Sequence, residues 1–253
     1  MIIEFDESNG LLDMWVDRII AEYKDITHTN EYITKFVNKY GTADKPIKFG
    51  VRTESLGTHA IRDIFTNHKG HVSRKYVEGR LKELRHIENT SVFSMETLVE
   101  ADKHGNICVT GGMLTVRRSV LARDLCYWIH DLDALWKQHQ WLIRHEVGHL
   151  IDYMVNMHGH PRSKLIDRCK DTRENYSRHR AWVEQYKKEP GFDIHRINRA
   201  YYNIPIEARA NEYAGIDIED MIKMITEAKA KYAEKHIKLK IEVVGVEDEV
   251  KKS

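Results

Sequence analysis

The chain has 253 residues, of which 42% are hydrophobic and 31% are charged, and its formal net charge is +1. This composition is typical of a soluble globular protein with one large domain or two small ones, and the small net charge excludes a global attraction to nucleic acid or to a membrane surface. The three cysteines form no CxxC pair, which argues against a disulfide framework or a cysteine-built zinc knuckle and favours a reducing compartment.

The N-terminal sequence and the hydropathy pattern give no sign of export or of a membrane span. The first ten residues, MIIEFDESNG, are acidic and lack the apolar run of a signal peptide. No stretch approaches the roughly 18 consecutive apolar residues that a membrane-spanning helix needs. We therefore expect a cytoplasmic protein that does not contact a membrane.

The N-terminal part of the chain is expected to be mainly helical. Apolar residues recur at three- and four-residue spacing over residues 11–40, which predicts one or two helices ending before Gly41. Residues 46–51 are a strand candidate, and residues 71–86 predict a helix whose basic face is more typical of a solvated surface than of a nucleic-acid contact. We treat residues 1–100 as an N-terminal region of unknown function, whose packing on the rest of the chain is left open.

Two β-prone runs follow in NICVTGGMLTVRRS, residues 106–119. The pair Gly111-Gly112 between them suits the positive φ angles of a tight turn, which predicts a β-hairpin. Two roles stay open for this hairpin: it contributes to the core alone, or its outer strand borders a cleft and pairs with an extended peptide.

The C-terminal half carries a succession of helical patterns. The longest covers residues 132–157, in which apolar residues recur mostly at three- and four-residue intervals. Residues 162–189 form a charged segment with few apolar residues, and residues 200–215 are helical after Pro205. Residues 219–240 predict a further amphipathic helix before a charged tail.

These elements predict an α+β fold that is dominated by helices, with a small sheet or hairpin beside the 132–157 helix. We expect a catalytic domain over residues 101–225 and a C-terminal helix and tail over residues 226–253. No internal repeat and no low-complexity linker is visible in the sequence.

The stretch RHEVGHLIDY, residues 144–153, lies within the long predicted helix and contains the pattern HExxH. On a helix His145 and His149 lie on one face, so both imidazoles can bind one metal ion. Glu146 projects about 100° around the helix, to the side of that ion, where it can deprotonate a water molecule without being a ligand. This arrangement is typical of zinc enzymes that hydrolyse peptide bonds.

Gly148 and Asp152 add to this pattern. Glycine is unfavourable in the middle of a helix, so Gly148 indicates close packing or a site. Asp152 lies on the same face as the two histidines, where its carboxylate can accept the second ring N–H of a ligating histidine. The alternative for Asp152 is a solvated carboxylate on the helix surface.

A catalytic zinc site needs a third protein ligand and one position open to water. Val155 stands where HExxHxxGxxH would have its third histidine, which excludes that class. Glu207 is the better candidate, because Pro205 begins its helix and small alanines follow, so that this helix can lie close to the first. The alternative for Glu207 is an exposed carboxylate favoured by the helix dipole.

Three further residues bear on the ligand set. Asn211 lies one turn after Glu207 and can hydrogen-bond across the two helices to fix a ligand. His158 and His160 follow the long helix and are conceivable ligands, although His-Gly-His before a proline is more typical of a polar loop.

HEVGHLIDY followed by EARANEYA resembles the gluzincin metallopeptidases, in which two helices supply His, His and Glu. Over residues 132–215 the chain is similar to the zinc domain of lethal-factor-type toxins, which share HExGHxxD and a later ExxAxx[FY]. It is also similar to the ImmA/IrrE-like peptidases, which have ExxANxFA. The resemblance implies a zincin-like fold that binds Zn²⁺.

The resemblance also implies roles for individual residues. It makes His145, His149 and Glu207 the zinc ligands, Glu146 the general base, and Asp152 and Asn211 the residues that support the ligands. Such families often have a tyrosine just upstream of the glutamate that donates to the oxyanion. Tyr201 and Tyr202 lie in that region, and Tyr201 is favoured.

The leading interpretation is a zinc metalloendopeptidase that hydrolyses a peptide bond of a peptide or protein substrate by Glu-assisted attack of zinc-bound water. Two alternatives stay open: a non-catalytic zincin-like module, and a nucleic-acid-associated protease that uses the basic residues of 162–189. An intact Glu146 argues against the first, because a structural metal site has no use for a base. Acidic residues interleaved in 162–189 favour a solvated helix over the second.

Overall fold

The computed structural model describes residues 10–54, 91–128 and 131–234. In these residues it has an α+β fold dominated by helices, with a three-stranded sheet. The elements, in chain order, are α1 (Gly10–Thr29), α2 (Glu31–Tyr40), β1 (Lys48–Glu54), β2 (Phe93–Ala101), β3 (Ile107–Arg117), α5 (Arg118–Tyr127), α6 (Leu132–Asn156), α7 (Arg162–Tyr186), α8 (Ile194–Tyr202), α9 (Pro205–Ala214) and α10 (Ile218–Glu234).

The sheet has the order β1-β3-β2, with β1 parallel and β2 antiparallel to the central strand β3. The turn between β2 and β3 is stabilised by Asp102, whose carboxylate accepts from the backbone N–H groups of His104 and Asn106, both at 2.8 Å. Gly105 in this turn has φ +80°, which suits glycine. A hairpin therefore exists, but its turn lies at residues 102–106.

The prediction of a turn at Gly111-Gly112 is wrong, because both glycines lie inside β3. A β-carbon at Gly111, where φ is +154°, would stand 1.9 Å from the carbonyl oxygen of Lys48 in β1. A β-carbon at Gly112 would stand 2.5 Å from Cδ2 of Leu150 in α6. The glycines thus permit close approach of a strand and a helix to β3. Since β3 is paired on both sides, it offers no free edge to a peptide.

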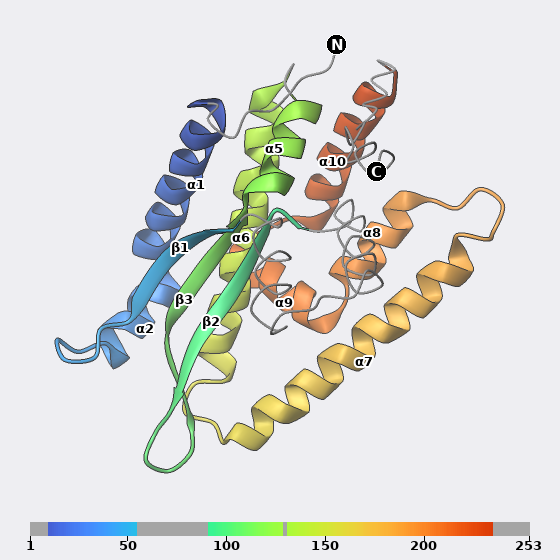
Figure 1. Ribbon diagram of the computed structural model, residues 1–253. Coiled ribbons are helices and arrows are strands. Elements are labelled where there is room, and N and C mark those ends of the chain that lie inside the picture. The colour runs from blue at the N-terminus through green and yellow to red at the C-terminus, as the bar shows by residue number, and fades with distance from the viewer. Residues whose placement is uncertain (1–9, 55–90, 129–130, 235–253) are drawn as a thin grey trace, which may run out of the picture.

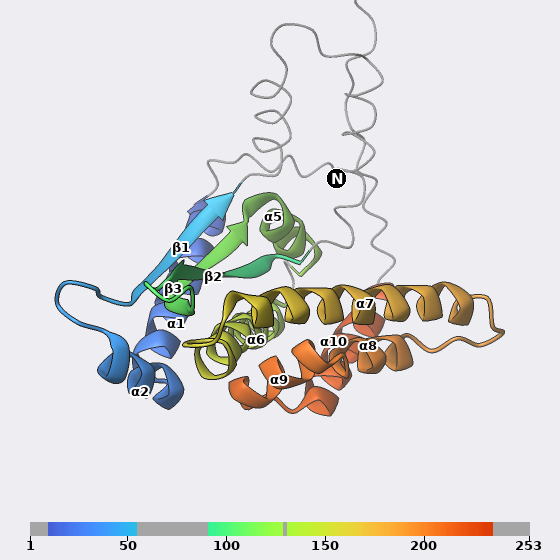
Figure 2. The same ribbon diagram turned by 90° about the horizontal axis from the view of Figure 1, so that it is seen from below.

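The core lies between the sheet and the helices α1 and α6, which cover one face of the sheet (Figure 1). It includes Ile19 of α1, Leu114 of β3, and Ile143 and Leu150 of α6, each fully buried. Helix α6 contacts the sheet on one side and α9 on the other (Figure 2). Its central position makes α6 the element on which the other parts are assembled.

Several predicted elements are confirmed within the described residues. Residues 11–40 form two helices, and they separate at Asn30, whose side chain accepts from the backbone N–H groups of Tyr32 and Ile33 at the start of α2. The long helix, the helix beginning at Pro205 and the helix after residue 217 are α6, α9 and α10. Helix α8 was not predicted.

Two other expectations concern segments outside the described residues and the expected domain boundary. The helix expected over residues 71–86 and the tail after residue 234 lie outside the described residues. The boundary expected at residue 100 falls inside β2, and one hydrophobic cluster contains residues from both sides of it. None of the described helices is both long and apolar enough to cross a membrane.

Candidate metal centre

Helix α6 presents His145 and His149 to α9. Gly148 lies between them in the sequence, and a β-carbon there would stand 2.0 Å from the carbonyl oxygen of Ala210 in α9. Any larger residue would force the two helices apart. The glycine that looked unfavourable for a helix is therefore explained by close packing, and it brings α9 within reach of both imidazoles.

Helix α9 begins with Pro205 and carries Glu207 in its first turn. Proline suits this position because its missing N–H would have no partner in the helix and its φ is already helical. Glu207 is only 1% exposed, so the alternative of a solvated carboxylate is wrong. Burying a carboxylate requires compensating partners, and Glu207 finds them on α6 and α7.

The three predicted ligands come together. Oε2 of Glu207 lies 2.9 Å from Nε2 of His145 and 3.5 Å from Nε2 of His149. One candidate ligand atom from each of the three residues lies within 4.8 Å of the other two. A tetrahedral centre with the bond lengths of zinc separates its ligand atoms by about 3.3 Å. This group can therefore hold a metal ion. In the described part of the chain, it is the group of three or more His, Cys, Asp or Glu residues whose ligand atoms all lie this close together.

The surroundings of His145 favour a cation at its Nε2. Its Nδ1 lies 2.8 Å from Oδ1 of Asn211, so the predicted hydrogen bond across the helices is present. Its Nε2 faces the carboxylate of Glu207. Both ring nitrogens thus face acceptors, and a proton or a metal ion must lie between Nε2 and the carboxylate. Burial lowers the pKa of His145, but the hydrogen bond and charge of Glu207 outweigh burial, and the net pKa is raised.

Glu207 is ionised in this environment. Burial alone would raise its pKa, but hydrogen bonds and charge interactions with His145 and His149 outweigh this effect and hold the pKa of Glu207 well below its ordinary value. A carboxylate that stays charged is the form that can bind a metal ion.

Glu146 lies beside the ligand group and is not part of it. Its Oε2 accepts from the backbone N–H of Met95 at 2.9 Å, which ties α6 to strand β2. Burial raises the pKa of Glu146, although His149 and His145 nearby oppose the shift. Glu146 is therefore a poorly solvated carboxylate with a pKa above its usual range, held between the histidines and the sheet.

Three tyrosines surround Glu207, and one of them was not predicted. The ring of Tyr202 lies 5.8 Å from the ring of His145, and burial raises the pKa of Tyr202 to about 12. The ring of Tyr201 lies between those of Tyr202, at 5.2 Å, and Tyr176, at 6.1 Å. The hydroxyl of Tyr176, on α7, donates to Oε1 of Glu207. A phenol with a raised pKa stays protonated at neutral pH and remains a donor.

Asp152 is placed differently from the prediction. It is fully buried and accepts from Nε of Arg209 at 3.1 Å, from Nδ2 of Asn156 at 2.7 Å and from the guanidinium of Arg168. No hydrogen bond joins it to His145 or His149 among the described contacts, so its expected role on a histidine ring is wrong. Its partners show why: α7 and α9 each supply an arginine, and Asp152 joins α6 to both.

His158 and His160 do not join the ligand group. Nδ1 of His158 accepts from the backbone N–H of Val109 at 3.1 Å, and its ring packs against those of Phe36 and Tyr40. The carbonyl oxygen of His160 accepts from the backbone N–H of Ile107 at 2.8 Å. The His-Gly-His loop thus fixes the end of α6 to the start of β3.

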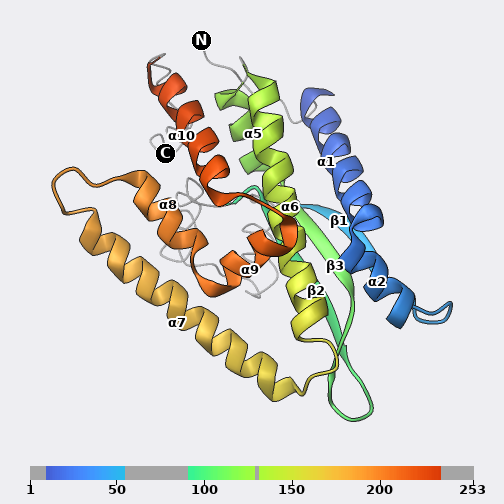
Figure 3. The same cartoon turned by 180° about the vertical axis from the view of Figure 1, so that it is seen from behind.

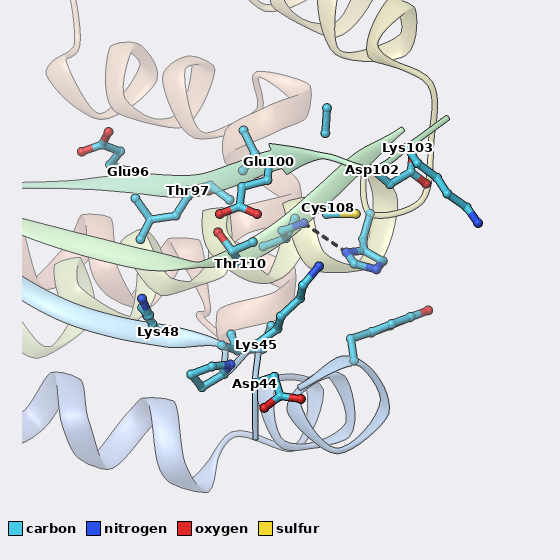
Figure 4. Close-up of a pocket in the computed structure, with 18 of the residues that line it drawn as sticks. Asp44, Lys45, Lys48, Glu96, Thr97, Glu100, Asp102, Lys103, Cys108 and Thr110 are labelled. Carbon is cyan, nitrogen blue, oxygen red and sulfur yellow. Dashed lines mark hydrogen bonds between the residues drawn. The ribbon is translucent and has the colours of Figure 1, made fainter. Parts of the chain in front are cut away.

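A groove of about 1190 Å³ lies away from the metal centre, around the turn of the hairpin (Figure 4). Its charged side chains are of both signs, with Lys45 and Lys48 on one side and Glu96 and Glu100 on β2. It includes Cys108, which is a free cysteine, and none of the three candidate ligands.

Comparisons of the chain with models of protein families, with curated proteins and with solved structures found no match.

Proposed function

We propose that the protein is a zinc-dependent metallopeptidase of the gluzincin type with a zincin-like fold, and that it hydrolyses a peptide bond in a peptide or protein substrate. The observation that carries the proposal is the convergence of His145 and His149 of α6 with Glu207 of α9, while Glu146 stays outside the ligand group. A site with three protein ligands and a separate, partly buried carboxylate is the arrangement of a catalytic metal.

The donor set fits zinc. Two imidazole nitrogens and one carboxylate oxygen are ligands that zinc uses in hydrolytic enzymes. When bound, zinc acts as a Lewis acid and lowers the pKa of a coordinated water molecule to about 7. The side chain of His149 is 20% exposed, whereas that of Glu207 is 2% exposed, so the ligand group opens toward solvent on the side of His149.

Glu146 is the residue that takes the proton from the attacking water. Burial favours the protonated form of Glu146, so its carboxylate is suited to accept a proton, and it lies beside the two histidines without being a ligand. It then returns the proton to the leaving amine. Tyr201 and Tyr202, protonated phenols close to His145 and Glu207, are candidates for stabilising the oxyanion.

The edge of β2 offers a place for the substrate backbone. The N–H of Met95 points to Glu146, so this edge of β2 lies directly beside the general base. A peptide that adds to β2 as a further strand would bring its backbone past the metal centre. The sequence analysis considered peptide pairing for the 106–119 segment, and in this proposal the peptide pairs with β2 instead.

The deciding experiment compares the wild-type protein with Glu146→Gln. Both should bind one zinc ion per chain, measured by elemental analysis, because Glu146 is not a ligand. The amide cannot accept a proton, so hydrolysis of a peptide library should fall by about 10²–10⁴-fold in Glu146→Gln.

Two outcomes would contradict the proposal. Zinc binding without hydrolysis by the wild type over a broad peptide set would favour a non-catalytic zincin-like module. Hydrolysis that survives in Glu146→Gln would mean that another group takes the proton.

The nucleic-acid alternative gains no support from α7. Arg168 is occupied by Asp152. The other basic residues of this segment are exposed among acidic ones, as in a solvated helix surface.

A further inference from the structure

The face of α7 that points toward the site is polar in its middle. The less exposed side chains of α7 include a stripe at helical spacing, namely Leu165, Arg168, Thr172, Tyr176, His179, Val183 and Tyr186. A helix that only covers a core carries apolar residues along its whole inner stripe. The middle of α7 therefore contacts polar groups, and one of them is Glu207.

Helix α7 is anchored on both sides of this polar stretch. Toward its start, Arg168 forms an ion pair with the buried Asp152 of α6. At its end, the ring of Tyr186 is buried and stacks on that of Trp182, and its hydroxyl accepts from the backbone N–H of Asp193 at 3.0 Å. Figure 3 shows α7 running past α8 and α9, so its middle lies next to the helix that carries Glu207.

The two oxygens of Glu207 have different partners. Oε2 faces Nε2 of His145 and Nε2 of His149. Oε1 accepts a hydrogen bond from the hydroxyl of Tyr176. The carboxylate is thus divided, with one oxygen on the side of the two imidazoles and the other on the side of α7.

We propose that Tyr176 is a positioning residue, which holds Glu207 as a one-oxygen ligand by keeping Oε1 in a hydrogen bond. The inference rests on the proposed function and adds to it how a coordination position is kept free. A carboxylate can bind a metal through one or both oxygens. Binding through both would occupy space that a catalytic zinc site leaves to water.

The test is the variant Tyr176→Phe. The matched control is Tyr186→Phe, which also removes a hydroxyl from α7 but at a contact with Asp193, away from Glu207. Both proteins are loaded with Co²⁺, whose visible absorption weakens when its coordination number rises from four to five. We expect a weaker Co²⁺ spectrum in Tyr176→Phe alone. We also expect its zinc affinity, measured by competition with a chromophoric chelator, to fall roughly 10-fold, as for other lost hydrogen bonds to metal ligands.

Three outcomes would overturn the inference, and they are distinguishable. If Glu207→Ala loses the metal but Tyr176→Phe changes neither spectrum nor affinity, Tyr176 has no positioning role and the proposed function stands. If Tyr176→Phe loses turnover with an unchanged Co²⁺ spectrum, the phenol acts on the substrate instead. If the wild type binds neither Co²⁺ nor zinc, the proposed function itself fails.

Discussion

Two buried histidines on α6 have opposite surroundings. His139 is fully buried, and its Nδ1 accepts a hydrogen bond of 2.9 Å from the indole Nε1 of Trp15. The ring of Phe93 packs edge-on against it at 5.3 Å. Its Nε2 lies 3.7 Å from Oδ2 of Asp124, beyond hydrogen-bond distance. A donor on Nδ1 leaves that nitrogen no lone pair for a metal, so His139 is a histidine of the core.

His145, less than two turns further along the same helix, is 5% exposed and faces two acceptors, Oδ1 of Asn211 and Oε2 of Glu207. Burial is therefore the same in kind at both positions, and the partners differ. The imidazole of His139 accepts from a donor on Nδ1, and its Nε2 has no hydrogen-bond partner among the described residues. The imidazole of His145 lies between two acceptors, where a proton or a metal ion can complete the site. The pairing of each ring nitrogen, rather than burial, separates a core histidine from a candidate ligand.

The largest expected effect comes from removing each of these histidines. His145→Ala should lose most of the bound zinc, and its unfolding temperature should no longer depend on added zinc. For the wild type, zinc at about 1,000 times its Kd contributes about 4 kcal/mol to the free energy of unfolding. His139→Ala should instead bind zinc normally and lose roughly 2–5 kcal/mol, because it leaves a cavity in the core.

Metal analysis and thermal unfolding with and without zinc measure both variants. If His139→Ala lost zinc as completely as His145→Ala, the two histidines would not have separate roles. In that case the contrast between donor and acceptor partners would have no functional meaning.

A smaller effect is expected where α6 meets α9. Gly148→Ala places a methyl group 2.0 Å from the carbonyl oxygen of Ala210, so the two helices must move apart. Alanine is the better helix former by about 1 kcal/mol, and the overpacking, which typically costs about 1–3 kcal/mol, should outweigh that gain. The variant should be less stable to denaturant and should bind zinc more weakly.

Gly10→Ala is the control for this substitution, because among the described residues no atom beyond its chain neighbours and its own helix backbone lies within 4 Å of a β-carbon at Gly10. We expect its free energy of unfolding to stay within about 0.5 kcal/mol of the wild type. A Gly148→Ala protein that is more stable than the wild type would show that the helices can separate without loss. The close approach of α6 and α9 would then not be needed for the candidate metal centre.

Much of the candidate metal centre could be predicted because its pattern is local. The spacing of His145 and His149 depends only on helix geometry, and Pro205 marks the start of the helix that carries Glu207. Gly148 also gave a usable indication, since an unfavourable residue in a helix needs a reason. These features require no knowledge of which distant segments meet.

The predictions for Gly111-Gly112 and Asp152 were wrong because contacts with distant segments of the chain determine the structure at these positions. Gly111-Gly112 has the composition of a turn, but the approach of Lys48 and Leu150 to β3 explains both glycines. Asp152 lies on the right face for a histidine, but Arg168 and Arg209 come from other helices and take its oxygens.

Tyr176 lies in the segment 162–189, whose many charged residues led to the interpretation of a solvated helix. The helical spacing of Arg168, Thr172, Tyr176 and His179 was visible in the sequence. It could have indicated a polar inner face, but nothing in the sequence said what that face contacts.

The smallest expected effect concerns Asn211. Its side chain is the acceptor at Nδ1 of His145, whereas at Nδ1 of His139 the partner is a donor, Trp15. Asn211→Leu removes the acceptor from Nδ1 of His145 while keeping a side chain of similar size, so the ring loses the bond that fixes its orientation. Loss of such a bond lowers metal affinity by about 10–100-fold, and we expect the lower end because α9 still packs against the ring. Asn211→Asp keeps an oxygen at this place, replaces Nδ2, which has no partner among the described residues, with a second oxygen, and adds a negative charge beside the imidazole. It should therefore bind zinc more tightly than Asn211→Leu in the same chelator competition. Equal affinities in Asn211→Leu and the wild type would mean that packing alone orients His145.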